Sequence, residues 1–103
     1  MRYAKRPDNN HAEIRDQLRA IPGMRLLDTA AMSGLGCDLL CRWQDGPPVM
    51  LEIKSAAKKP LTDSERRAQR LFDGYWYRVE TLDDVLRVFG ISADPAPAEW
   101  GKR

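Results

Sequence analysis

An acidic and a basic residue stand one position apart in the apolar stretch "VMLEIKSAAKKPLT", residues 49–62. If this stretch is a strand, Glu52 and Lys54 share one face and lie about 6–7 Å apart along it. The apolar Leu51 and Ile53 point to the opposite face, toward a core. The two charges are therefore displayed together, either as a salt-bridged pair on a solvated face or as part of a site.

A third ionisable residue favours the site. Asp38 lies 14 positions before Glu52, across a predicted hairpin, so the two carboxylates meet if their strands are neighbours. Adjacent carboxylates repel, and one takes up a proton unless a cation lies between them. Mg²⁺ suits such a pair, with the Ile53 carbonyl as a further oxygen ligand. Lys54 would then hold or deprotonate a water that attacks phosphorus, or stabilise the developing charge.

A cluster of basic residues follows the acid-base pair. The formal net charge is only +2, but five basic residues fall within 13 positions. Together with the polar Gln69, we predict that these residues contact DNA phosphates: Lys58, Lys59, Arg66, Arg67 and Arg70. A solvated helix face is the alternative. Phosphate contacts do not read bases, so binding is expected to be selective for structure and not for sequence.

Hydrophobic periodicity and end signals predict the elements that position these residues. We expect helices at 10–20, 62–73 and 82–89, and strands at 24–30, 37–43, 49–55 and 75–80. The fold class is α/β, with the order α-β-β-β-α-β-α and a mixed four-stranded central sheet flanked by helices. One domain is expected over 1–91, with a basic N-terminal arm at 1–9 and a flexible tail at 92–103.

The pattern "GLGCDLLCRW…VMLEIKSAAKKPLT" resembles the PD-(D/E)XK nuclease superfamily, and within it the small stand-alone virus-type replication-repair nucleases (VRR-NUC). The resemblance spans roughly residues 8–90 and implies a restriction-endonuclease-like core. The matching residues are Asp38, then Glu52, Ile53 and Lys54, then Ser55, Lys59, Leu61 and Thr62. The family also has a Glu on its first helix, matched by Glu13 in "HAEIRDQL". The chain departs from the family at Cys37, where Pro is usual, and at Glu65, where Gln is frequent.

The resemblance implies a Mg²⁺-dependent DNA endonuclease, with Mn²⁺ as a substitute ion. Asp38, Glu52, the Ile53 carbonyl and Glu13 would serve the metal, and Lys54 would position the nucleophile. Stand-alone members of the family imply a phage or prophage repair enzyme in the bacterial cytoplasm. They also imply a homodimer that cuts branched DNA such as Holliday junctions, since two-fold pairing suits two symmetric cuts. The alternatives are a non-catalytic nucleic-acid-binding module with a nuclease-like fold, and an interaction protein whose charged pair is a salt bridge.

Several side chains near the predicted site have two interpretations. Glu65 completes a capping box with Thr62, which leaves a polar role in the site to Glu65 itself or to Gln69. With Asn10 as N-cap, Glu13 would serve either the helix end or the metal site.

The remaining expectations concern packing and environment. His11 is expected on the surface, and Cys37 and Cys41 as buried free thiols on one face of a strand, in a reducing cytosol. The aromatic residues, Trp43, Tyr75, Trp76 and Tyr77, are expected to be structural. No apolar run is long enough for a membrane span, and the N-terminus lacks the apolar stretch of a signal peptide.

Overall fold

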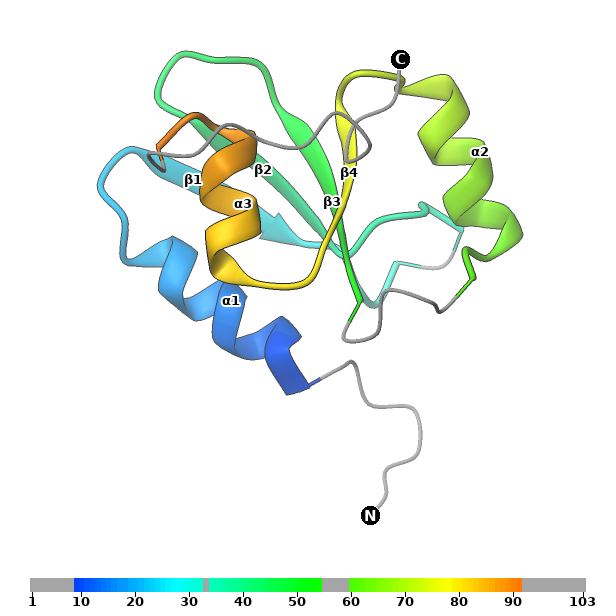
Figure 1. Ribbon diagram of the computed structural model, residues 1–103, viewed down its shortest axis with the longest axis horizontal. Coiled ribbons are helices and arrows are strands. Elements are labelled where there is room, and N and C mark those ends of the chain that lie inside the picture. Colours follow the sequence, from blue (N-terminus) through cyan, green and yellow to red (C-terminus); the bar gives the residue numbers. More distant parts are fainter. Residues whose placement is uncertain (1–8, 33, 55–59, 92–103) are drawn as a thin grey trace.

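The computed structural model describes residues 9–32, 34–54 and 60–91 (Figure 1). These residues form, in order, α1 (Asn9–Arg19), β1 (Met24–Asp28), β2 (Leu39–Trp43), β3 (Val49–Ile53), α2 (Asp63–Leu71), β4 (Trp76–Val79) and α3 (Leu82–Val88). The predicted α/β class, with a mixed four-stranded sheet and helices on its faces, is confirmed.

The sheet has the strand order β1-β2-β3-β4. The pairs β1-β2 and β2-β3 are antiparallel, and β3 pairs with β4 in parallel after the crossover through α2. Strand β2, the antiparallel partner of β3, therefore begins at the end of the sheet where β3 and β4 both end. Charged residues at these three strand ends are brought close together.

The helices form a layer on each face of the sheet (Figure 1). Ile14 and Leu18 of α1 and Val85 of α3 are buried in one apolar cluster with the inward side chains of the strands. On the opposite face, Ala68 of α2 packs with Met50 and Trp76. The indole Nε1 of Trp76 donates to a backbone carbonyl at 2.8 Å, so this aromatic residue is structural, as expected.

Two expectations about local structure are wrong. Helix α1 begins at Asn9, so Asn10 is not its N-cap; instead the Asn10 side-chain amide donates to the Glu80 carbonyl at 2.7 Å and ties α1 to the end of β4. Cys37 and Cys41 are buried and free, as predicted, but they do not share a face. β2 begins only at Leu39, so Cys37 precedes the strand and packs on the α2 side, while Cys41 packs on the α1 side.

Some predictions lie outside the described residues. They concern the arm, apart from Asn9, the tail at 92–103, and the basic residues Lys58 and Lys59. Within the part of the chain that the structure describes, no helix has the length and apolar character needed to cross a membrane.

Candidate active site

Asp38 and Glu52 meet where β2 begins and β3 ends. The register pairs Leu39 with Leu51, and one step further the Asp38 N–H donates to the Leu51 carbonyl at 2.8 Å. Oδ2 of Asp38 accepts the N–H of Ile53 at 2.8 Å. Neighbouring strands thus bring Asp38 beside Glu52 and Ile53, as the hairpin predicts.

Lys54 lies between two buried carboxylates. Its Nζ is 3.3 Å from Oε2 of Glu52 and 3.3 Å from Oε2 of Glu65. The exposed fractions of Glu52, Lys54 and Glu65 are 3%, 9% and 8%, so water screens these charges weakly. A salt bridge on a solvated face is therefore excluded as an account of the Glu52–Lys54 pair.

Glu65 serves the helix end and the charged cluster at once. Oε1 accepts the Thr62 N–H at 2.9 Å, and the Thr62 hydroxyl accepts the Glu65 N–H at 3.2 Å, which completes the predicted capping box. Oε2 is the oxygen that faces Lys54. The two interpretations of Glu65 are thus compatible. Gln69 is half-buried one turn further along α2, and no hydrogen bond found among the described residues joins it to the cluster.

The loop that leads to Asp38 is held against α2 at Gly36. This glycine has a φ of +87°, and a Cβ there would lie 2.5 Å from the Ser64 carbonyl oxygen and 2.7 Å from the Ala68 Cβ. Its own carbonyl accepts the Trp76 indole N–H at 2.8 Å. The close approach fixes the start of β2 relative to the helix that carries Glu65.

The Gly36→Ala variant is expected to lower the free energy of unfolding by about 2–5 kcal/mol, the sum of a left-handed non-glycine residue and overpacking. Gly34→Ala is the matched control, because Gly34 has a φ of +82° but no described atom lies within 4 Å of the place that a Cβ would take. The control should lose only about 1–2 kcal/mol. Chemical denaturation measures both values, and equal losses would show that the contact with α2 is unimportant.

Crowding of carboxylates changes the protonation of Glu52. Burial raises the pKa of Glu52 to about 9, and its hydrogen bond with Glu65 and the charge of Asp38 act in the same direction. The charge of Lys54 opposes this rise without cancelling it. Burial also raises the pKa of Asp38, although the N–H of Ile53 acts against the rise. Glu52 therefore carries a proton at neutral pH.

The other two members of the cluster favour their charged forms. Burial acts against ionised Glu65, but hydrogen bonds from Glu52 and the Thr62 N–H outweigh it and lower the pKa of Glu65. Burial also acts against charged Lys54, but Glu52 and Glu65 together raise the pKa of its ammonium group. At neutral pH the cluster is thus a Lys54–Glu65 ion pair beside a protonated Glu52.

The oxygen donors at this point suit a hard divalent cation. Asp38 and Glu52 offer carboxylates, and the Ile53 carbonyl faces the same strand edge as its N–H, since both groups of a strand residue point to one neighbour. Among the described residues, no three His, Cys, Asp or Glu side chains are already arranged around an ion position. Lys54 contacts the carboxylate of Glu52, and the Ile53 N–H donates to that of Asp38. A cation that displaced the Glu52 proton would relieve the crowding of negative charge.

No hydrogen bond or ion pair found among the described residues joins Glu13 to the carboxylates. Its side chain is exposed on α1. At about 100° per residue, Glu13 lies between about 100° and 160° around the helix from the buried Ile14, Leu18 and His11, outside their stripe. The predicted role of Glu13 at the metal therefore has no support in the geometry.

His11 is buried, whereas its polarity predicted a place on the surface. It is 3% exposed, and its Nε2 lies 3.4 Å from Oδ1 of Asp28 without a hydrogen bond among the described residues. Arg15 Nη1 holds the other oxygen of Asp28 at 2.9 Å. The imidazole is close enough to Asp38 to act on its pKa in the lowering direction, while burial, the larger effect, raises it. His11 lies on the same helical stripe as the buried Ile14 and Leu18. That spacing predicts a buried position, but the prediction from the sequence followed the polarity of the side chain instead.

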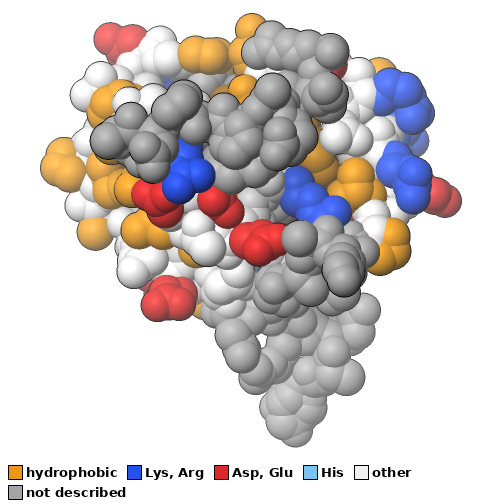
Figure 2. All heavy atoms as spheres, viewed as in Figure 1, with side chains coloured by type: hydrophobic (Ala, Val, Ile, Leu, Met, Phe, Trp, Pro, Cys, Tyr) orange, Lys and Arg blue, Asp and Glu red, His pale blue; other side chains and the backbone are white. Residues whose placement is uncertain are grey.

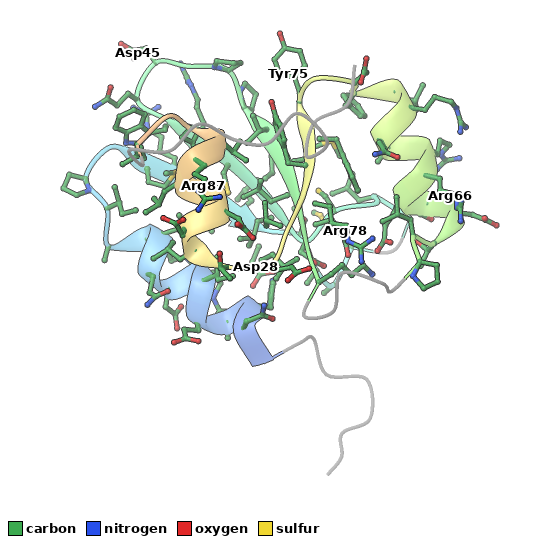
Figure 3. The ribbon with its side chains drawn as sticks, in the orientation of Figure 1. Asp28, Asp45, Arg66, Tyr75, Arg78 and Arg87 are labelled. Atoms are coloured by element: carbon green, nitrogen blue, oxygen red, sulfur yellow. The ribbon has the colours of Figure 1, made fainter. Side chains whose placement is uncertain are left out.

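Arg78 faces the site and was missed in the sequence. Its register partner across the parallel pair is Glu52. It alternates with Tyr77 and Val79, which pack on the α1 side, so Arg78 shares the α2 side with Trp76. Figure 3 shows the Arg78 side chain directed from β4 toward α2. The sequence could have indicated this position, because a parallel crossover makes β4 a neighbour of β3.

The predicted phosphate-binding residues of α2 lie on its outer surface. Arg66, Arg67 and Arg70 are exposed and line a pocket of about 370 Å³ with Asp63 and Ser64. Figure 2 shows basic side chains over α2 at the right of the view, and others beside acidic side chains near the centre.

Comparisons of the chain with models of protein families, with curated proteins and with solved structures found no match.

Proposed function

We propose that this chain is a Mg²⁺-dependent endonuclease that hydrolyses phosphodiester bonds in DNA, with Mn²⁺ as a substitute ion. The observation that carries the proposal is the Lys54 ammonium 3.3 Å from both Glu52 and Glu65, with Asp38 at the adjoining strand end. The mixed sheet and the crossover through α2 are compatible with the restriction-endonuclease-like core that the sequence resemblance implies.

Each residue of the proposed site has a distinct role. Asp38, Glu52 and the Ile53 carbonyl would hold the ion, which when bound supplies a Lewis acid and a water of lowered pKa. Lys54, an ammonium at neutral pH, donates hydrogen bonds that orient the attacking water and stabilises charge that develops on the phosphoryl oxygens. Glu65 fixes the position of Lys54. Glu13 has no role in the proposal, because it is exposed on α1 and no contact found among the described residues joins it to the carboxylates.

The competing interpretation is a purely structural ion-pair network. A network selected for stability would balance its charges, since burying ions is expensive unless they are paired. Here two carboxyl groups contact one ammonium, the carboxyl group of Asp38 lies at the adjoining strand end, and Glu52 retains a proton with a pKa of about 9. This surplus of carboxyl groups favours a site that receives a further cation.

The wider proposal follows the sequence resemblance. The substrate would be branched DNA such as a Holliday junction, bound in a structure-selective way, in phage or prophage DNA repair in the bacterial cytoplasm. A homodimer would place two such sites for paired cuts. A panel of four-way junction, flap, nicked duplex, plain duplex, single strand and RNA, each with Mg²⁺ or Mn²⁺, tests the substrate class.

The Asp38→Ala variant tests the site itself. Removal of a metal-holding carboxylate is expected to weaken Mg²⁺ and Mn²⁺ binding in calorimetric titration and to reduce cleavage at least about 10²-fold. Asp45→Ala is the matched control, because Asp45 is exposed in the β2–β3 connection, away from the cluster (Figure 3). Cleavage that survives in Asp38→Ala at the level of Asp45→Ala would rule out the proposed site.

A further inference from the structure

The α2 side of the sheet changes from apolar to charged within one step along two neighbouring strands. Met50 of β3 and Trp76 of β4 are register partners and are buried together in the apolar cluster under α2. The next residues on the same face, also register partners, are Glu52 and Arg78. The apolar contact with α2 ends at these two residues. Arg78, on β4, is the register partner of the buried Glu52 on β3.

The position of Arg78 relative to the cluster follows from the ladder. Register partners on adjacent strands are about 5 Å apart at their Cα atoms, so Arg78 is a lateral neighbour of Glu52. Arg78 is half-buried, while Glu52 is 3% exposed, so part of Arg78 reaches solvent on the strand next to the buried carboxylate.

A carboxylate-rich centre repels a DNA phosphate, and the enzyme needs cationic groups beside it to bring the phosphate near. Arginine suits this task because its planar guanidinium donates paired hydrogen bonds to phosphate oxygens and stays charged when partly buried. Arg66, Arg67 and Arg70 lie on the exposed surface of α2 and make that surface positively charged. Arg78 is next to the site itself.

We infer that Arg78 is a substrate-contacting residue, which binds a DNA phosphate at the entrance to the Asp38–Glu52–Lys54 centre. The inference rests on the proposed nuclease function and adds to it a residue that the sequence pattern did not include. An arginine that only stabilises the fold would also occupy this position, so the experiment has to separate binding of phosphate from stability.

The salt dependence of DNA binding makes this separation. Binding of a fluorescently labelled four-way junction is measured by anisotropy between about 50 and 200 mM salt, with Ca²⁺ in place of Mg²⁺ to limit cleavage. Arg78→Ala is expected to flatten the plot of log K against log salt by about 0.9, the value for one lost phosphate contact. Arg78→Lys, which keeps the charge, should restore the slope but not the full cleavage rate.

Arg25→Ala is the matched control, because Arg25 is an exposed arginine on β1, the opposite edge strand. It should bind with the wild-type slope. If Arg78→Ala keeps the wild-type slope while the wild type binds DNA, the inference about Arg78 is wrong and the proposed nuclease is unaffected. If the wild-type chain neither binds nor cuts any DNA of the panel, the proposed function fails and the inference falls with it. Should Arg78→Ala not fold, the comparison of Arg78→Lys and wild type in kcat and KM decides, since loss of paired hydrogen bonds raises KM or lowers kcat only for a residue at the substrate.

Discussion

The Lys54→Met variant is expected to lose phosphodiester cleavage by at least about 10²–10³-fold, the usual effect of removing one donor aimed at developing charge. DNA binding should remain, because the phosphate contacts proposed for Arg78 and the α2 arginines are unchanged. Methionine has a similar length and shape, so it fills the space of the side chain without the ammonium group. The measurements are single-turnover cleavage and anisotropy of the same labelled junction.

Lys54→Met also has an expected effect on stability, which has to be separated from catalysis. Loss of the ammonium leaves Glu65 buried and ionised, and breaking one side of a buried ion pair typically costs about 3–5 kcal/mol. The double variant Lys54→Met/Glu65→Gln removes both charges, while a Gln oxygen still accepts the Thr62 N–H. It should regain part of the lost stability and remain inactive. Cleavage by the single variant within about tenfold of the wild type would contradict a catalytic role for Lys54.

In metal-free buffer, the free energy of unfolding is expected to fall as the pH rises from about 5 to about 9. Glu52 has an ordinary pKa of 4.5 when unfolded and about 9 when folded, so the folded state binds more protons in this window. A group with a raised folded pKa stabilises the fold fully below its unfolded pKa and loses that contribution as the pH rises through the folded value. Thermal unfolding across this pH range measures the slope.

Glu65 and Lys54 do not produce this slope, whereas Asp38, whose pKa burial also raises above 3.8, adds to it in the same direction. Glu65, with a lowered pKa, contributes stability that is present above its unfolded pKa of 4.5 and is lost only as the pH falls. Lys54, with a raised pKa, contributes fully below 10.5. Both contributions are constant between about pH 5 and 9. The Glu52→Gln variant should therefore flatten the slope, and a wild-type slope in that variant would assign it to other groups.

A divalent cation should reverse the same pH dependence. A cation that binds Glu52 displaces its proton, so the apparent affinity for Mn²⁺ or Mg²⁺ is expected to rise up to about tenfold per pH unit below about pH 9. The increase in melting temperature on adding the ion should accordingly be larger near pH 8.5 than near pH 6. An equal increase at both pH values would argue against binding at Glu52.

The sequence was informative where local rules decide the structure. The alternation of Leu39, Cys41 and Trp43 onto one face follows from the two-residue period of a strand. The capping box of Thr62 and Glu65 likewise follows from two residues three positions apart. The meeting of Asp38 with the end of β3 required only that consecutive strands pair across a short connection.

The sequence was less informative where one element's position relative to another decides the contact. That Glu65 reaches Lys54 depends on how α2 lies on the sheet, which is fixed by the approach of Gly36 to Ser64. His11 was misplaced because polarity is a weak guide in a helix that also contacts the charged end of the sheet. The start of β2 was placed two residues early, and that error put Cys37 on the wrong face.

The two carboxylate oxygens of Glu65 make different contacts, and this limits which substitutions the protein tolerates at that position. One oxygen starts α2 and the other holds Lys54, so a single substitution at this position alters a helix end and a reactive group together. Glutamine preserves the first contact and removes the charge of the second, whereas aspartate is one methylene shorter and reaches less far toward either partner. Substitution of Glu65 is therefore limited both by the start of α2 and by the contact with Lys54. A tolerated substitution would be accompanied by compensating changes at Thr62 or Lys54.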